Sequence, residues 1–138
     1  MERNNIAIMI KIASIMFEKI ANPALAEYDL TFSQFKILKY LMVYKPDEPT
    51  RQIDLEEFFL MSNPTVTGIL NNLEKKGLIE RRPNPEDKRS KLIVPTEKAL
   101  GFTREFYDLS DKFDKELIAK LTDEEREEMR RLLVKIIY

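Results

Sequence analysis

Apolar side chains recur at helical spacing along most of the chain, and the clearest case spans residues 63–76. There, apolar residues three or four positions apart form one stripe: Val66, Ile69, Leu70 and Leu73. Ser62 or Asn63 is suited to cap this helix, and Gly77 to end it, because glycine readily adopts a left-handed backbone. A shorter helix is expected just before it, over about residues 52–59. The pattern predicts a helix–turn–helix whose second helix has a small, polar outer face.

Two longer helical segments precede this pair. The first, residues 5–21, is apolar around most of its circumference, so it needs burial on more than one side, by a second subunit or by the core of a monomer. Pro23 is expected to end it, because proline cannot continue a helix. The second covers residues 31–44 and begins with a capping box formed by Thr31 and Gln34. Its predicted buried face consists of Phe35, Leu38, Leu41 and Met42.

A hairpin and two further helices follow. Residues 78–82 and 89–94 are rich in strand-forming residues, and a turn-forming segment, 83–87, separates them. Thr96 is suited to cap one long helix, whose apolar row is Phe102, Phe106, Leu109, Phe113 and Leu117. A capping box that starts at Thr122 opens the last helix, with four side chains expected to face inward: Met129, Leu132, Leu133 and Ile136. The fold class is therefore mainly α with a small β-hairpin.

Composition narrows the chemistry that this chain can perform. The sequence has no cysteine and no histidine, which excludes disulfides and thiolate zinc sites and removes the commonest general base. Its three glycines form no phosphate-binding loop. We therefore expect no enzyme activity, no metal and no cofactor. The sequence shows no signal-type or membrane-spanning apolar segment, so we expect a cytoplasmic location and no membrane partner.

The positive charge of the chain coincides with the predicted helix–turn–helix and hairpin. Residues 62–101 carry a net charge of +3, whereas residues 1–61 and residues 102–138 each carry −2. A helix–turn–helix followed directly by a basic hairpin is typical of a winged helix, whose second helix enters the major groove of DNA. Hydroxyls and amides can contact base edges, and cations can neutralise phosphates. The candidate DNA-binding residues are Ser62, Asn63, Thr65, Thr67, Asn71, Asn72, Lys75, Arg81, Asp87, Lys88 and Arg89.

One stretch of the sequence resembles a known protein family. Residues 61–82 read MSNPTVTGILNNLEKKGLIERR, and the segment Asp-Lys-Arg follows at 87–89, with a threonine at 96. Together with the motif Leu-Thr-x-x-Gln-Phe at 30–35, these residues are similar to the MarR family of bacterial transcriptional regulators. The resemblance covers essentially the whole chain in length and in helix order. The family often has glycine in the turn where this chain has Leu60.

The resemblance implies a homodimer whose N- and C-terminal helices interlock. It implies a winged helix–turn–helix at about residues 31–96 of the single chain 1–138, with dimerisation helices at about 1–22 and 97–138. It also implies binding to a pseudo-palindromic operator, usually as a repressor. Release by a small aromatic or anionic effector, bound between the dimer helices and the winged part, is a frequent property of the family.

Asp87 and Arg89 in the predicted wing lie two residues apart, so in an extended segment both point to the same side. With the resemblance, this spacing favours a carboxylate that holds the Arg89 guanidinium ready to enter the minor groove of DNA. The competing interpretation is an ordinary charged pair in a turn, which contributes little energy.

The sequence leaves the presence of an effector pocket and the kind of partner open. An adaptable effector pocket could be lined by Met9, Met16, Phe17, Phe32, Tyr40 and Met42, but the same residues would also pack a dimer core. The chain could also be a dimeric winged-helix module that binds a protein partner and has little affinity for DNA. The net charge of −1 and the few cations on the predicted recognition helix are compatible with that function.

Overall fold

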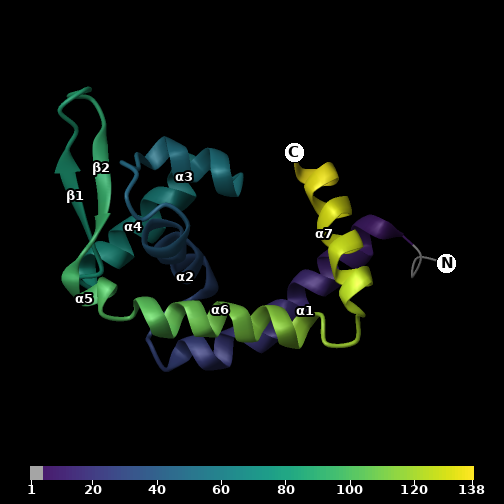
Figure 1. Cartoon of the computed structure of the whole chain (residues 1–138). Coiled ribbons are helices and arrows are strands. Elements are labelled where there is room, and N and C mark those ends of the chain that lie inside the picture. The colour runs from purple at the N-terminus through teal and green to yellow at the C-terminus, as the bar shows by residue number, and fades with distance from the viewer. Residues whose placement is uncertain (1–4) are drawn as a thin grey trace.

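A computed structural model describes residues 5–138, and Figure 1 shows a hairpin at one end of the molecule and α7 with the start of α1 at the other. The long helix α6 runs between these two ends. In chain order the elements are α1 (Ile6–Ala26), α2 (Phe32–Lys39), the π-helix η2 (Tyr40–Tyr44), α3 (Gln52–Phe59), α4 (Asn63–Lys75), β1 (Ile79–Pro83), β2 (Lys91–Pro95), α5 (Glu97–Leu100), α6 (Thr103–Leu117) and α7 (Asp123–Ile137). The predicted fold class, mainly α with one small hairpin, is confirmed.

The core is built from buried side chains of α1, α2, η2, α3, α4 and α6, together with the base of the hairpin. The predicted buried face of α2 and η2 is confirmed, since Phe35, Leu38, Leu41 and Met42 are all buried. The apolar stripe of α4 is also confirmed: three of its members are completely buried and Ile69 is packed against them at the edge of the core. This burial fixes which face of α4 turns to solvent.

The second strand of the hairpin also pairs with the segment that precedes α3. β1 and β2 are antiparallel, with Ile79 opposite Pro95. The N–H of Ile93 donates to the carbonyl oxygen of Thr50 at 2.8 Å, and the residue after Thr50 forms an isolated β-bridge with Leu92. The segment that leads into α3 therefore acts as a short third strand and holds the base of the hairpin beside α3.

Local capping signals in the sequence correspond to the observed helix ends. Thr31 and Gln34 form the predicted capping box of α2, and Thr122 with its partner three residues later does the same for α7. Ser62 caps α4 by accepting a hydrogen bond from a backbone N–H of its first turn. Gly77, at φ 71°, follows the end of α4 in the left-handed conformation that glycine tolerates.

Helix α1 continues through Pro23 to Ala26, so the prediction that this proline ends the helix is wrong. The proline removes one intrahelical hydrogen bond. Ala21 and Leu25, on either side of it, are completely buried in the core. Tertiary packing of the last turn therefore outweighs the local penalty, and the chain turns only at Asp29, whose φ is 55°.

The single long helix predicted after Thr96 is two helices, α5 and α6, with a break at Gly101 and Phe102. Glycine has low helix propensity. The hydroxyl of Thr103 donates to the carbonyl oxygen of Leu100 at 2.7 Å, which satisfies a group that the break leaves unpaired within the helix. The break lets α6 leave the winged part in a new direction and run toward α7 (Figure 1).

The apolar residues of the last helix do not face inward within this chain, contrary to the prediction. None of the residues of α7 is buried, and Leu132 and Ile136 are 44% and 63% exposed. The first half of α1 is similar, with Ile12 52% exposed. Their apolar spacing is real, but no other part of the described chain covers them. Among residues 5–138, no helix is both long enough and apolar enough to cross a lipid bilayer.

Candidate nucleic-acid interface

The exposed face of α4 carries the polar side chains that the sequence singled out. With Val66, Leu70 and Leu73 fully buried on one side, Asn71 and Asn72 are exposed on the other. Ser62, Asn63, Thr65 and Lys75 are also exposed, and Thr67 is half-buried. Gly68 has no neighbouring atom within 4 Å of the position a Cβ would occupy, so its surface is open. The helix therefore presents hydrogen-bonding groups without bulky side chains in front of them.

Two of these polar side chains are held in place by α3. Gln52 Nε2 donates to Thr67 Oγ1 at 2.9 Å, and Asn63 Nδ2 donates to Glu56 Oε2 at 3.2 Å. The sequence patterns did not single out Gln52 or Glu56. No local motif could have identified them, because their partners depend on the angle at which α3 meets α4.

The C-terminal end of α4 is joined to the turn between α1 and α2. Lys76 Nζ donates to Gln34 Oε1 at 3.0 Å and also to the backbone carbonyl of Asp29. Gln34 is buried and at the same time completes the capping box of α2. These bonds connect the position of α4 to the place where α1 ends.

Arg81 points along the sheet toward α4, where its guanidinium is bound by two residues. Nη2 donates to Asn71 Oδ1 at 3.0 Å, and Nη1 forms an ion pair with Glu74 at 3.2 Å. Only 19% of the Arg81 side chain is exposed. Its neighbour Arg82 is 60% exposed and pairs with Glu80 of the same strand. The two arginines therefore differ, since Arg81 alone of the two contacts α4.

The wing tip is ordered by its own side chains. Asp87 Oδ1 accepts a hydrogen bond from the backbone N–H of Arg89 at 2.9 Å, and Asn84 Nδ2 donates to Ser90 Oγ at 3.0 Å. The expected contact between the Asp87 carboxylate and the Arg89 guanidinium is absent, so that prediction is wrong for the described chain. The carboxylate instead fixes the backbone, because a two-residue turn brings the nearest donor, the amide, to it.

Lys88 and Arg89 extend from this turn as exposed cations. Neither side chain forms an ion pair with any residue in the 5–138 segment that the structure describes. An exposed cation with no protein partner keeps its charge available to a phosphate. The wing tip thus offers two such charges, whereas Arg81 and Arg82 at the strand are already paired.

The start of α3, beside the base of the wing, is fixed by one ion pair. Asp54 accepts from the backbone N–H of Arg51 at 2.8 Å, and its other oxygen pairs with the guanidinium at 2.9 Å. The hydrogen bond from Arg51 lowers the pKa of Asp54 below its ordinary value. The carboxylate therefore stays charged and caps the helix that carries Gln52 and Glu56.

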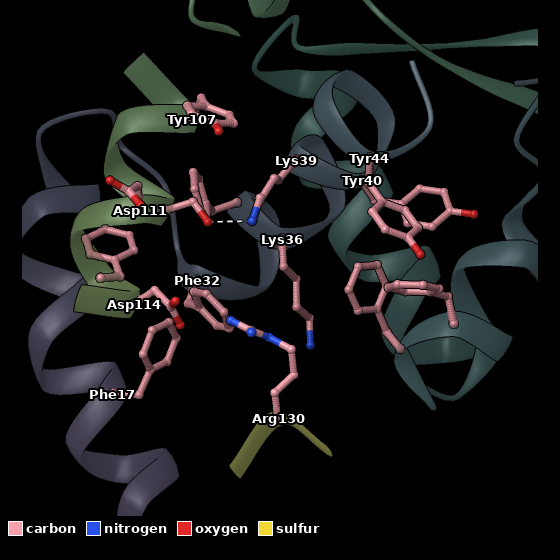
Figure 2. A pocket seen from close by; sticks show the side chains of 15 residues that line it. Phe17, Phe32, Lys36, Lys39, Tyr40, Tyr44, Tyr107, Asp111, Asp114 and Arg130 are labelled. Atoms are coloured by element: carbon pink, nitrogen blue, oxygen red, sulfur yellow. Dashed lines mark hydrogen bonds between the residues drawn. The ribbon is translucent and has the colours of Figure 1, made fainter. Parts of the chain in front are cut away.

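A separate cavity of 580 Å³ opens between the winged part and the long helices, with aromatic rings on most of its wall (Figure 2). Lys36, Lys39 and Arg130 bring cationic groups to it from α2 and α7, and Asp111 and Asp114 bring carboxylates from α6. Burial lowers the pKa of Lys36, whose Nζ lies 5.2 Å from the centre of the Phe59 ring. Lys39 donates to Ser110 Oγ, the bond drawn as a dashed line in Figure 2. The cavity wall thus combines a largely aromatic surface with three cations and two carboxylates.

Only some of the residues that the sequence suggested for an effector pocket line this cavity. Phe17, Phe32 and Tyr40 line the cavity. The methionines do not: Met42 is buried in the core, and Met9 and Met16 are exposed on α1. The π-helix η2 contributes two tyrosines to the cavity wall, and no sequence signal predicted that irregular turn.

Comparison with known proteins identifies the family. The sequence model of the MarR family matches residues 30–91, which include α2, α3, α4 and β1. YwoH of Bacillus subtilis, an uncharacterized HTH-type transcriptional regulator, is 33% identical over 117 residues, covering 85% of this chain and 82% of that relative. The chain belongs to the MarR family. It is therefore a MarR-family transcriptional regulator, and the relatives that it matches are transcription regulators, a non-enzymatic role.

Solved structures of other MarR-family proteins have the same winged-helix fold. The S. aureus MepR–DNA complex matches with a TM-score of 0.85 and 29% identity, over 96% of both chains. An E. coli MarR variant complexed with operator DNA matches with a TM-score of 0.86 and 25% identity, over 99% of this chain and 96% of that chain. Both of these relatives were solved bound to DNA.

Proposed function

We propose that this MarR-family protein is a homodimeric repressor that binds a pseudo-palindromic operator with α4 in the major groove and the wing against the minor groove. The observation that carries the proposal is the exposed polar face of α4 beside a wing tip whose Lys88 and Arg89 have no partner among the described residues. Two relatives of similar fold bind DNA, which supports the same use here.

The proposed contacts fall into two groups. Thr65, Thr67, Asn71 and Asn72 face base edges, while Ser62, Asn63, Lys75, Lys88 and Arg89 face the sugar–phosphate backbone or the minor groove. Arg81 and Asp87 act through the groups they hold, Asn71 in one case and the backbone of Arg89 in the other. Base contacts give sequence preference, whereas phosphate contacts give affinity that depends on salt.

The homodimer is supported by the uncovered apolar faces of α1 and α7. A soluble chain rarely leaves a large contiguous apolar surface exposed to water. A second copy would cover these faces and place two recognition helices on one side of the assembly. Two-fold symmetry would then require an operator with two inverted half-sites.

Release by a small aromatic anion is supported by the cavity in Figure 2, where aromatic rings lie beside three cations that outnumber the two carboxylates. Benzoate is a suitable probe, and benzamide is its neutral control of the same shape. We expect benzoate to weaken DNA binding by the native protein and to act less on Lys36→Met, which removes a cation but keeps most of the chain length. An equal effect of benzoate and benzamide would contradict the proposal.

The experiment that tests the proposed function is selection of bound duplexes from a random pool, followed by sequencing. We expect one motif with two inverted half-sites, and an affinity that falls linearly with salt on logarithmic axes. Binding to all duplexes without enrichment would contradict a sequence-specific operator. No salt-dependent binding to DNA at all would instead indicate the protein-interaction module.

A further inference from the structure

We propose that Arg81 determines which base Asn71 accepts, by holding the oxygen of the Asn71 side chain and leaving its amino group to face DNA. This inference rests on the proposed function and adds a base preference to it. Arg81 is a positioning residue in this scheme, since it acts through Asn71.

The orientation of the Asn71 amide follows from the chemistry of its partner. A guanidinium can only donate hydrogen bonds, so the atom of Asn71 that lies 3.0 Å from Arg81 Nη2 must be the oxygen. Arg81 is itself fixed, because its other terminal nitrogen pairs with Glu74 Oε1 at 3.2 Å. Glu74 and Asn71 lie one turn apart on α4, which suits the planar fork of the guanidinium.

This arrangement restricts what Asn71 can read in the major groove. A free asparagine recognises adenine by accepting from N6 and donating to N7 together. That pairing needs the oxygen and the nitrogen at the same base edge, whereas here the oxygen is turned toward β1. The amino group that remains has two protons to donate and matches an edge with acceptors alone.

Guanine is the base whose major-groove edge offers two adjacent acceptors, O6 and N7. Thymine offers one acceptor, adenine combines an acceptor with a donor, and cytosine offers a donor that would face another donor. We therefore expect guanine to be preferred opposite Asn71 in each half-site. Thr67 adds to this donor character, because its hydroxyl oxygen already accepts from Gln52 and its proton is left to donate.

The test compares duplexes selected from one random pool by the native protein and by four variants. Asn71→Ala locates the relevant base pair, as the motif position where preference disappears. Arg81→Met removes the donor while keeping an extended side chain, and should lower the guanine-to-adenine ratio at that position by about fivefold. Arg82→Met is the matched control, since this arginine pairs with Glu80 and makes no hydrogen bond to α4.

Asn71→Asp gives a second readout that does not depend on removing Arg81. An aspartate still pairs with Arg81, so the fold should be kept, but it presents an acceptor in place of the donor. Preference at that position should change from guanine to cytosine, whose N4 is a donor. Thermal unfolding followed by circular dichroism confirms that each variant is folded.

Several outcomes would overturn this inference without contradicting the proposed function. These are a motif without guanine at the Asn71 position, an unchanged ratio in Arg81→Met, an equal change in Arg82→Met, or guanine retained by Asn71→Asp. Failure of the proposed function looks different, because the native protein would then enrich no motif. That result would remove the base preference together with the function on which it rests.

Discussion

The winged part and the terminal helices of this protein use the same helical spacing of apolar residues but satisfy it in different ways. On α4, the stripe residues Val66, Leu70 and Leu73 are completely buried by the rest of the chain. On α7, Leu132 and Ile136 are 44% and 63% exposed. A periodic pattern thus predicts that a helix has an apolar face, but it does not say which chain covers that face.

The energetic consequence differs for the two regions. Burying a leucine or isoleucine side chain contributes about 1.5–3 kcal/mol relative to leaving it in water. The winged part gains this stabilisation within one chain. The exposed apolar residues of α1 and α7 would gain it only if a second copy covered them, as proposed, and the stability of this end should then depend on protein concentration.

The largest expected effect comes from introducing charged side chains on the uncovered apolar faces of α1 and α7. Ile12→Asp combined with Leu132→Asp places carboxylates at the proposed dimer contact, where burial of an unpaired charge costs several kcal/mol. We expect the mass in sedimentation equilibrium to fall from dimer to monomer, with loss of high-affinity operator binding. Lys120→Asp, an exposed position in the turn between α6 and α7, is the control. If the double variant stayed dimeric, the proposal that these faces form the dimer interface would be wrong.

A change in the core of the winged part should lower its stability without altering the uncovered apolar faces of α1 and α7. Leu70→Ala creates a cavity at a completely buried position and should lower the free energy of unfolding by about 2–5 kcal/mol. Thr65→Ala, on the exposed face of the same helix, should change it by less than about 0.5 kcal/mol. Urea denaturation at a fixed protein concentration measures both. Similar values for the two variants would contradict the assignment of the core.

The wing tip differs from both regions, because its exposed cations form no ion pair with the described residues and are proposed to contact DNA instead. Arg89→Ala should weaken operator binding about tenfold and lower the salt slope by about two in a dimer, since each contact occurs twice. Asp87→Ala should also weaken binding, although it removes a negative charge, because the Arg89 backbone loses its hydrogen bond. Arg104→Ala, exposed on α6, should have no effect. Tighter binding by Asp87→Ala would exclude this role of the carboxylate.

A smaller, pH-dependent effect is expected at the start of α3. Because Arg51 lowers the pKa of Asp54 in the folded protein, their pairing stabilises the fold above the ordinary carboxyl pKa and is lost as pH falls through the lowered one. Asp54→Asn should therefore lower the free energy of unfolding by about 1 kcal/mol at pH 7. The difference from the native protein should shrink toward zero in acid. A difference that is constant with pH would indicate another cause.

The smallest expected effect concerns the turn between α3 and α4. Leu60 has a φ of 52° and is 78% exposed, so a leucine occupies a left-handed position where its Cβ is unfavourable. Leu60→Gly should raise the free energy of unfolding by about 0.5 kcal/mol, because the relief of strain exceeds the added chain entropy. Leu60→Ala keeps the Cβ and should not stabilise the protein. A higher Tm for the alanine variant than for the glycine variant would contradict this explanation.

Sequence patterns predicted the local features of this molecule well where neighbouring residues decide them. The capping boxes that begin at Thr31 and Thr122, the Ser62 cap and the left-handed Gly77 all depend on contacts within a few residues. The prediction failed at Pro23, where the local penalty is real but packing of Leu25 outweighs it. It failed again near Gly101, where one apolar row continues across two helices.

In the candidate site, too, the sequence predicted local properties but not the contacts between separate elements. The sequence indicated that the face of α4 is polar and that the wing is basic, because side-chain type and helical period are local properties. It could not show that Arg81 turns inward to Asn71 and Glu74, that Gln52 holds Thr67, or that Asp87 binds the backbone of Arg89. These pairings depend on angles between elements.

By itself, the sequence determined the order of the helices, the positions of most of their caps, the composition of the recognition face and the resemblance to the MarR family. Only the tertiary structure decided which charged groups are paired, which apolar faces remain uncovered and where a cavity opens. The difference arises from the distance along the chain over which each kind of interaction acts. Backbone propensity and capping act over about one helical turn, whereas hydrogen bonds and burial between distant segments exist only once the elements have been placed against one another.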